Sequence, residues 1–273
     1  MAIDLHIHST ASDGTLDPEE IIRLAAKLGL SAIAITDHDS VEGVGPALKE
    51  GERLGIEVIP AVELSSDLQG RDIHFLGYFI DFKQEWFRKH LEKLRQARYE
   101  RAVKMVQRLR EAGLEIALRD VLKEAGEGAV GRAHIARVLV KQGLIDGIEE
   151  VFSRYIGRHA PCYVEKYIYT PEDIIAIVRK AGGIAILAHP GYSLVDEQIS
   201  EFIRYGLQGL EAYYHTHTPK QTKRYERLAE RHGLMVTGGS DCHGLKSSRG
   251  LLIGSVNVPD RVIQDLKRLK EGV

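Results

Sequence analysis

Short apolar runs alternate with amphipathic segments along most of this 273-residue chain, and this alternation constrains its fold more than any other feature. The apolar runs predict seven strands, at residues 3–8, 31–36, 56–64, 72–80, 184–191, 207–215 and 234–244. Amphipathic segments between them predict helices, including one over 170–183 with Thr170 as its N-cap. Continuous apolar strands that alternate with helices predict a parallel sheet that is covered on both faces or closed into a barrel.

The strand signal disappears between residues 82 and 165. The segment 85–114 predicts one long helix, which carries nine lysines and arginines against four glutamates. Shorter predicted helices follow at 119–126, 132–143 and 148–157. A charged helix of this kind usually presents its charges to solvent. We therefore expect an α/β barrel domain formed by residues 1–81 and 166–273, with residues 82–165 inserted as an all-helical cap domain.

Residues of types that can bind metals stand at an end of every predicted strand. They are His6, His8 and Asp13; Asp37, His38 and Asp39; Glu63; His74; His189; His215 and His217; and Asp241 and His243. Within the first strand, alternation places Asp4, His6 and His8 on one side. Because the carboxyl ends of parallel strands gather on one face of an α/β fold, we expect these side chains to converge.

The residue types at the strand ends indicate the chemistry. Imidazole together with carboxylate suits Zn, Mn and Fe, and the number of candidate ligands exceeds what one ion can bind. We therefore expect two or three divalent metal ions. Clustered ions lower the pKa of water and stabilise both the attacking and the leaving oxygen of a phosphate ester. The sequence contains no motif for a serine or cysteine nucleophile and no phosphate-binding P-loop.

The composition argues against several other classes of protein. The formal net charge is −2, which gives no bulk-charge argument for binding nucleic acid or membranes. Cys162 and Cys242 are too few for a disulfide framework, and alternation turns Cys242 away from its neighbours and into the core. The sequence shows no secretory signal pattern and no apolar run long enough to span a membrane, so we expect a cytoplasmic protein.

Six motifs of this sequence together resemble the PHP (polymerase and histidinol phosphatase) phosphoesterases. They are DLHIHSTASDG, ITDHD, AVELS, IHFLGY, LAHP and GSDCHG. The resemblance implies a distorted seven-stranded (β/α) barrel with a trinuclear metal centre. It also implies three ligand sets: His6, His8, Glu63 and Asp241 for one ion; Asp13, His38 and His243 for a second; and Glu63, as a bridge, with His74 and His189 for a third.

The inserted helices narrow the resemblance to one branch of the family. The run GRAHIARVLV, with Arg132 and His134, and the later HTH are similar to PHP members that hydrolyse nucleotide phosphates or trim RNA from its 5' end. We expect Arg132, at a helix start that favours anions, to bind a phosphate in a bidentate way. His134 and His217 are the other expected substrate-binding residues.

The sequence thus predicts a metal-dependent phosphoesterase that acts on AMP, a 3',5'-bisphosphorylated nucleotide or a short 5'-phosphorylated RNA. A metal-bridging hydroxide, positioned by Asp13, His38, Glu63 and Asp241, would attack phosphorus. One alternative is a histidinol-phosphate phosphatase, which shares the metal motifs. Another is a non-catalytic PHP module that binds metal or a partner protein. An inactive module is expected to have lost metal ligands, whereas all nine ligand positions are filled here, which argues against this alternative. The sequence identifies no protein partner.

Overall fold

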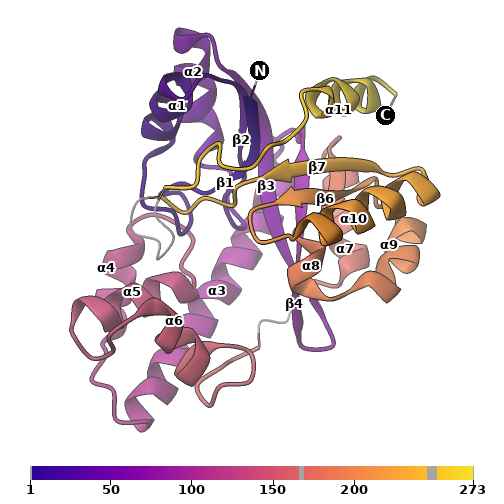
Figure 1. Cartoon of the computed structure of the whole chain (residues 1–273). Helices are drawn as coiled ribbons and strands as arrows, with labels where there is room; N and C mark the ends of the chain where they lie inside the picture. Colours follow the sequence, from indigo (N-terminus) through magenta and orange to yellow (C-terminus); the bar gives the residue numbers. More distant parts are fainter. Residues whose placement is uncertain (1, 166–168, 245–250, 273) are drawn as a thin grey trace.

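A seven-stranded sheet, whose strand order follows the sequence, forms the centre of the molecule (Figure 1). The computed structural model describes residues 2–165, 169–244 and 251–272. The strands are β1 (Ala2–Ile7), β2 (Leu30–Ile35), β3 (Glu57–Leu68), β4 (Arg71–Tyr78), β5 (Ile184–Leu187), β6 (Gly209–Tyr214) and β7 (Met235–Gly239). All seven predicted strands are therefore confirmed.

Most helices that flank the sheet lie where the amphipathic segments predict them; α8 is an exception, because the sequence predicts a strand up to residue 191 where β5 ends at Leu187. Those around the strands are α1 (Pro18–Lys27), α2 (Val44–Leu54), α7 (Pro171–Lys180), α8 (Pro190–Ser193), the 3-10 helix η2 (Asp196–Gln198), α9 (Ile199–Tyr205), α10 (Pro219–His232) and α11 (Arg261–Glu271). The oxygen of the Thr170 side chain accepts a hydrogen bond from the Asp173 amide, which confirms the predicted N-cap of α7. Between β4 and α7 lie α3 (Glu85–Glu111), α4 (Leu118–Ala125), α5 (Arg132–Lys141), α6 (Ile148–Val151) and the π-helix η1 (Phe152–Ile156).

The sheet curls into a nearly closed barrel because its first and last strands meet. The amide of Asp241 donates to the carbonyl of His6 at 2.8 Å, and the amide of His8 donates to the carbonyl of Cys242 at 3.0 Å. The predicted seven-stranded α/β barrel is therefore confirmed. Cys242 is 1% exposed and packs in an apolar cluster with Ile7, as predicted for a core residue.

The expectation of an all-parallel sheet is wrong for β4, which pairs antiparallel with both β3 and β5. Only Gln69 and Gly70 connect β3 to β4, and both have positive φ, at 53° and 76°. A two-residue connection of this kind joins antiparallel neighbours, whereas parallel strands need a long crossover. Because β4 runs in reverse, His74 near its start lies at the same end of the barrel as the carboxyl ends of the parallel strands.

Helix α3 is shared between the barrel and the inserted helices. It has 27 residues, which corresponds to a length of about 40 Å. Phe87 and Leu94, in its first half, pack in the same apolar cluster as Phe75 of β4. Met105 and Leu109, in its second half, pack instead with residues of α4, α5 and α6. One continuous helix thus joins two separate apolar clusters.

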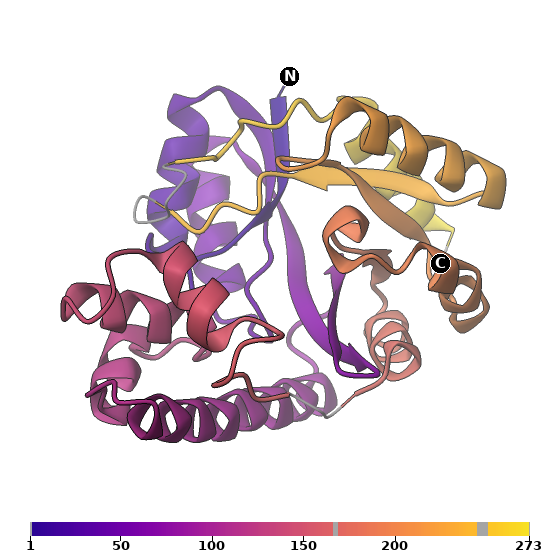
Figure 2. The same ribbon diagram turned by 60° about the horizontal axis from the view of Figure 1, so that its bottom comes forward.

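The arrangement of α3 bears on the expected domain limits. Because its first half packs on the barrel, contacts cross the expected boundary at residue 82, and that boundary stays a prediction. The expected boundary at residue 166 lies outside the described residues. Figure 2 shows α3 along one side of the barrel and the group α8, α9 and α10 on another side. Within the described ranges, no helix is long and apolar enough to cross a membrane.

Candidate metal centre

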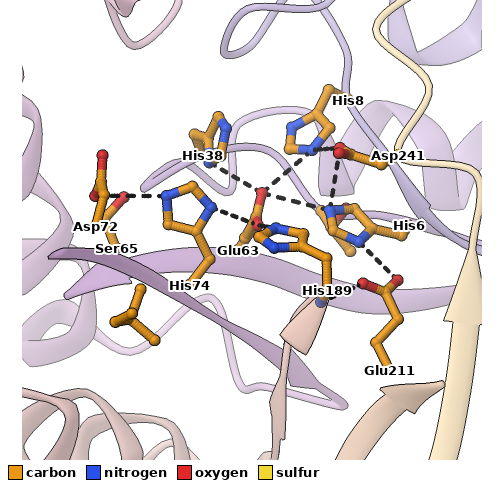
Figure 3. A network of polar contacts seen from close by, with 12 residues as sticks. His6, His8, His38, Glu63, Ser65, Asp72, His74, His189, Glu211 and Asp241 are labelled. Atoms are coloured by element: carbon orange, nitrogen blue, oxygen red, sulfur yellow. Dashed lines mark hydrogen bonds and ion pairs between the residues drawn. The ribbon is translucent and has the colours of Figure 1, made fainter. Parts of the chain in front are cut away.

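The carboxylate of Glu63, on β3, lies at the centre of a ring of imidazoles (Figure 3). The nitrogens nearest to its two oxygens, at 2.9–3.4 Å, belong to His6, His8, His38, His74 and His189. His6 and His74 lie on β1 and β4, whereas His8, His38 and His189 lie in the loops that follow β1, β2 and β5. The strand-end pattern therefore does bring ligand-type side chains together at one mouth of the barrel.

Three groups of side chains at this mouth have ligand atoms within 4.8 Å of one another. The groups are His6, His8, Glu63 and Asp241; His8, Asp13, His38 and His243; and His38, Glu63 and His74. The first group is the ligand set that the family resemblance implies for one ion. The second contains the set implied for another ion, with His8 in addition. The third shares Glu63 and His74 with the remaining implied set, and His189 Nε2 lies 3.0 Å from Glu63 Oε1.

The separations of the donor atoms, and the lack of hydrogen-bond partners for several of them, suit bound metal ions. Protein nitrogen and oxygen ligands lie about 2.0–2.2 Å from a metal such as Zn, which places two ligands of one ion about 3 Å apart. The separations around Glu63, such as 3.4 Å to His6 and 2.9 Å to His74, are close to this value. Within the described part of the chain, His6 Nε2, His38 Nδ1 and Glu63 Oε2 are also buried without a hydrogen-bond partner. Divalent cations between these atoms would satisfy all of them.

The backbone is unusual at three positions around the mouth. Asp39, His189 and Asp241 have positive φ angles of 52°, 29° and 51°. Such angles cost a non-glycine residue about 1–3 kcal/mol, and they persist where the surrounding structure holds them in place. Two of these residues, His189 and Asp241, are candidate ligands. The turns after β5 and β7 are therefore shaped to aim these side chains inward.

Charge coupling across the mouth favours anionic carboxylates. Burial raises the pKa of Glu63, but His38 and His74 outweigh it and hold the pKa well below the usual range. Burial opposes protonation of His74, but Glu63 raises its pKa to about 9. For His38 burial prevails, and its pKa falls to about 4. Cations are thus attracted to the carboxylates here, and metal ions would take the place of the protons.

Glu211, on β6, supports two of the ligands and was not anticipated from the sequence. His6 Nδ1 donates to its Oε1 at 2.8 Å, and the His189 amide donates to its Oε2 at 2.8 Å (Figure 3). This contact leaves His6 Nε2 as the atom that faces the metal cluster. Tyr214 makes a similar contact, because its hydroxyl donates to Asp241 Oδ2 at 2.8 Å. The only signal for Glu211 is a single carboxylate inside the apolar run GLEAYY.

Two aspartates near the strand ends are structural. Asp37 accepts hydrogen bonds from the hydroxyls of Ser9 and Ser12, both at 2.6 Å. Asp4 accepts from the amides of Ser240 and Gly254 at 2.9 Å and 2.8 Å. Both carboxylates fasten loops of the mouth to the barrel and are outside the three ligand groups.

Three arginines close the other side of the cavity, which has a volume of about 260 Å³. Arg98 and Arg101 come from the middle of α3, and Arg132 begins α5. Arg98 Nε donates to Asp39 Oδ2 at 2.5 Å, and a second nitrogen donates to the Ser65 hydroxyl at 2.9 Å. The inserted helices therefore supply positive charge opposite the histidines and carboxylates of the barrel.

Arg101 and Arg132 share a carboxylate partner. A terminal nitrogen of each lies 3.4 Å from Asp72 Oδ2, and Arg101 Nε donates to the Val164 carbonyl at 2.7 Å. The remaining nitrogen of Arg101, Nη2, is buried and has no hydrogen-bond partner in the described parts of the chain. A buried charged donor without an acceptor is costly, so this nitrogen provides a contact for an anion in the cavity.

Of the three expected substrate-binding residues, only Arg132 lines the cavity. His134 is 1% exposed, and its Nδ1 accepts a hydrogen bond from the Gly131 amide at 2.9 Å, as an N-terminal helix cap. His217 Nδ1 donates to the Ala212 carbonyl, and its Nε2 accepts from the Gly191 amide. Backbone groups thus contact Nδ1 of His134 and both ring nitrogens of His217, and the expected role of these histidines in binding substrate stays a prediction. The ring of His215 packs on Tyr214, outside the three ligand groups.

Comparison with known proteins agrees with this geometry. The PHP domain model matches residues 4–165. The chain belongs to the PHP domain family. The 5'-3' exoribonuclease Rnm of Escherichia coli (strain K12) is 34% identical to this PHP chain over 247 residues, which cover 88% of this chain and 84% of the relative. A 3',5'-nucleoside bisphosphate phosphatase of Chromobacterium violaceum is 33% identical over 247 residues, which cover 88% and 87% of the two chains.

A solved structure has the same fold. The protein, from Bifidobacterium adolescentis, superposes on this PHP chain with a TM-score of 0.88 and 33% identity, over 97% of this chain and 94% of the other. Family membership, the shared fold and the ligand groups together make this protein a metal-dependent phosphoesterase that uses divalent metal ions.

Proposed function

We propose that this PHP phosphoesterase hydrolyses a phosphate ester of a nucleotide, such as AMP or a 3',5'-bisphosphate, or the 5' end of a short RNA. The observation that carries the proposal is the row of three arginines that faces the ligand groups across one cavity. Arg101 Nη2, buried without a partner among the described residues, adds an unused donor there. Among these substrates, both features fit best the bisphosphate or the RNA 5' end, which carry more negative charge than one scissile phosphate.

The proposed cofactor is two or three ions of Mn, Fe or Zn, held by the nine expected ligands. Bound ions of this kind lower the pKa of water and stabilise negative charge on phosphate oxygens. The roles of the chain's own groups follow from their contacts. Glu211 fixes the ring of His6, and Tyr214 orients Asp241. Asp39 and Ser65 hold Arg98 in place, so that its charge is preorganised for a phosphate.

Aromatic side chains at the cavity suit the nucleoside part of such a substrate. Tyr192 on α8 lines the cavity and is 71% exposed, which is unusual for a large aromatic residue. Its ring meets that of the candidate ligand His189 edge to face, with 5.7 Å between the ring centres. Phe152 lines the opposite side, below the Arg132 guanidinium. A nucleobase that stacks on the exposed Tyr192 ring would gain about 1–3 kcal/mol.

Two relatives support this choice of substrate class. One is named as an exoribonuclease and the other as a nucleoside bisphosphate phosphatase, and each is matched over more than four fifths of its length. Histidinol phosphate is the competing substrate from the sequence analysis. Like AMP, it carries a single phosphate and would leave part of the arginine row without an anion; unlike AMP, it has no nucleobase to stack on Tyr192.

The test is a substrate panel on one preparation whose metal content is also measured. The substrates are AMP, adenosine 3',5'-bisphosphate, histidinol phosphate and a short 5'-phosphorylated RNA. We expect kcat/KM for the bisphosphate to exceed that for AMP, because its second phosphate gives the arginine row another anion to bind. Highest activity on histidinol phosphate, or no activity on any nucleotide or RNA, would overturn the proposal.

A further inference from the structure

Helix α10 carries a stripe of positive charge on its outer face. Five cations line a shallow surface groove along one side of the helix: Lys220, the adjacent pair Lys223 and Arg224, Arg227 and Arg231. The other side of the helix is buried through Tyr225 and Ala229. Among the described residues, no carboxylate lines the groove. We call these five residues the α10 stripe.

Most of the α10 stripe has no counter-charge. Arg224 pairs with Asp196 of η2. The other four cations are exposed, and within the described ranges none of them has a carboxylate within ion-pair distance. The whole chain has a net charge of only −2, so five cations on one helix face form a local concentration of charge. This local field attracts polyanions although the chain as a whole is nearly neutral.

The stripe begins beside the mouth of the barrel. α10 follows β6, and Gln221 in its first turn approaches Gly191, which lies between His189 and the exposed Tyr192. The pair Arg224–Asp196 joins the edge of the stripe to the segment that follows α8. Lys220 and Arg231 are eleven residues apart, which is about 16 Å along the helix. Figures 1 and 2 place α8, α9 and α10 together, away from the inserted helices.

The other large groove of the molecule does not have this character. It lies between α3 and the segment before α5, and it is lined by Arg88, Lys89 and Arg95 but also by Glu42, Glu85 and Glu92. Arg88 pairs with Glu42, and Lys89 pairs with Glu85. Its charges therefore cancel, whereas those of the α10 stripe add.

We propose that the α10 stripe binds the phosphate backbone of a single-stranded RNA whose 5' end occupies the metal cavity. This inference rests on the proposed function and selects its RNA substrate over a mononucleotide. An RNA chain that leaves the cavity past Tyr192 reaches the first turn of α10. A positively charged groove next to an exposed aromatic ring is the combination that binds single strands without sequence preference. The stripe adds affinity for the portion of the substrate that is not being cleaved.

The experiment uses the metal-loaded enzyme and two triple variants. The test variant combines Lys223→Gln, Arg227→Gln and Arg231→Gln, all in exposed positions. The control variant removes the same charge from other exposed sites by Lys27→Gln, Lys49→Gln and Arg110→Gln. The substrates are adenosine 3',5'-bisphosphate and 5'-phosphorylated RNAs of increasing length. A double variant, Lys220→Gln with Lys223→Gln, repeats the test if the triple variant folds poorly.

We expect kcat/KM of the wild-type enzyme to rise with RNA length and the test variant to lose most of this rise. Both triple variants should hydrolyse the bisphosphate like the wild type, because a mononucleotide does not reach the stripe. Equilibrium binding of a 3'-fluorescein-labelled RNA in EDTA gives a readout that is independent of catalysis. Loss of three phosphate contacts should reduce the slope of log K against log salt by about 2.

Each outcome separates this inference from the proposed function. Hydrolysis of mononucleotides with no length dependence, and unchanged RNA binding by the test variant, would overturn the α10 inference alone. Weaker RNA binding by the test variant, in an enzyme that hydrolyses no nucleotide or RNA, would overturn the proposed function alone. If the test variant lost binding to phosphatidylglycerol vesicles but not to RNA, the stripe would be a membrane contact and the RNA inference would fail.

Discussion

The two sides of the cavity are built in different ways. The barrel side consists of side chains at strand ends, where a parallel sheet gathers them irrespective of how far apart they lie in the sequence. The inserted side consists mainly of two arginines on one helix, Arg98 and Arg101, together with Arg132. The residues of the barrel side occur in short sequence motifs, whereas those of the inserted side depend on which face of a helix points into the cavity. The barrel side of the cavity can therefore be predicted from the sequence, and the inserted side cannot.

The middle of α3 explains why its arginines are at the mouth. The first half of the helix belongs to the barrel cluster and the second half to the cluster of the inserted helices. Arg98 and Arg101 lie between the two halves, where neither apolar cluster covers them, and each is 8% exposed. We expect the barrel side to govern the reaction itself and the inserted side to govern the choice of substrate. The following experiments test that division.

The largest effect is expected from loss of metal on the barrel side. Removal of metal ions with a chelator, or Glu63→Gln, should reduce kcat by about a thousandfold or more, because several kcal/mol of charge stabilisation is lost. Elemental analysis of protein prepared without chelator should show two to three equivalents of Mn, Fe or Zn. Glu57→Gln, at the exposed start of the same strand, is the matched control. Full activity in metal-free protein would refute the metal centre.

Arg132→Ala tests the inserted side. A lost charge-assisted contact costs about 1.5–3 kcal/mol, so KM for nucleotide phosphates should rise about ten- to a hundredfold. Hydrolysis of p-nitrophenyl phosphate should fall less, because that ester has no second group for the inserted helices to bind. Arg88→Ala, on the exposed side of α3, should change neither. An equal loss on both substrates would show that Arg132 serves the reaction or the fold, which contradicts the proposed division.

Glu211→Gln tests the support of the metal ligands from within the barrel. The amide would weaken the contact that orients His6, and such changes lower metal affinity or activity about ten- to a hundredfold. Competition with a chromophoric chelator measures the affinity directly. Glu226→Gln, which changes the partner of the Tyr213 hydroxyl away from the ligands, is the control. Unchanged metal affinity in Glu211→Gln would show that the ligands need no support from β6.

The smallest effect concerns the acid stability of the inserted helices. Burial lowers the pKa of His134 to about 4, against about 6.5 in the unfolded chain. Its neutral form therefore stabilises the fold fully above pH 6.5, and this contribution is lost as the pH falls from 6.5 towards 4. At pH 5.5 the loss is about 1.4 kcal/mol. His134→Gln keeps an acceptor at the helix start but does not titrate.

Chemical denaturation of both proteins at pH 7.5 and pH 5.5 measures the effect of His134. The wild type should lose more stability than His134→Gln between the two values, and the ionisable groups common to both proteins cancel in the difference. Equal losses would show that His134 does not contribute to acid sensitivity.

The barrel was predictable because its pattern is local and repeated. Seven apolar runs with metal-binding ends give the strand count, the α/β barrel and the convergence of His6, Glu63 and Asp241. The reverse direction of β4 was missed because an apolar strand looks the same in either direction. The short turn at Gln69 and Gly70 was the available signal.

The inserted side was harder to predict for a physical reason. Arg98 and Arg101 look like part of a solvated helix face, as basic residues on a charged helix usually are. They nevertheless continue the spacing of Leu91 and Leu94 along the buried side of α3, and that is the signal in retrospect. For His134 and His217 the sequence suggests a role at the surface of the site, and the structure shows contacts that the sequence does not reveal. Their residue type suggested contact with substrate, but the backbone groups that hold them are invisible in the sequence.

The meeting of β1 with β7 has a consequence for the order of events during synthesis. Of the nine expected ligands, His6, His8, Asp13, His38, Glu63 and His74 precede the inserted helices, whereas His189, Asp241 and His243 follow them. A nascent chain emerges from the ribosome with its amino-terminal part first. It therefore presents a partial ligand set for as long as the remaining residues are being translated. The full set exists only after the Asp241 amide has bonded to His6, so complete metal loading is a late step in maturation.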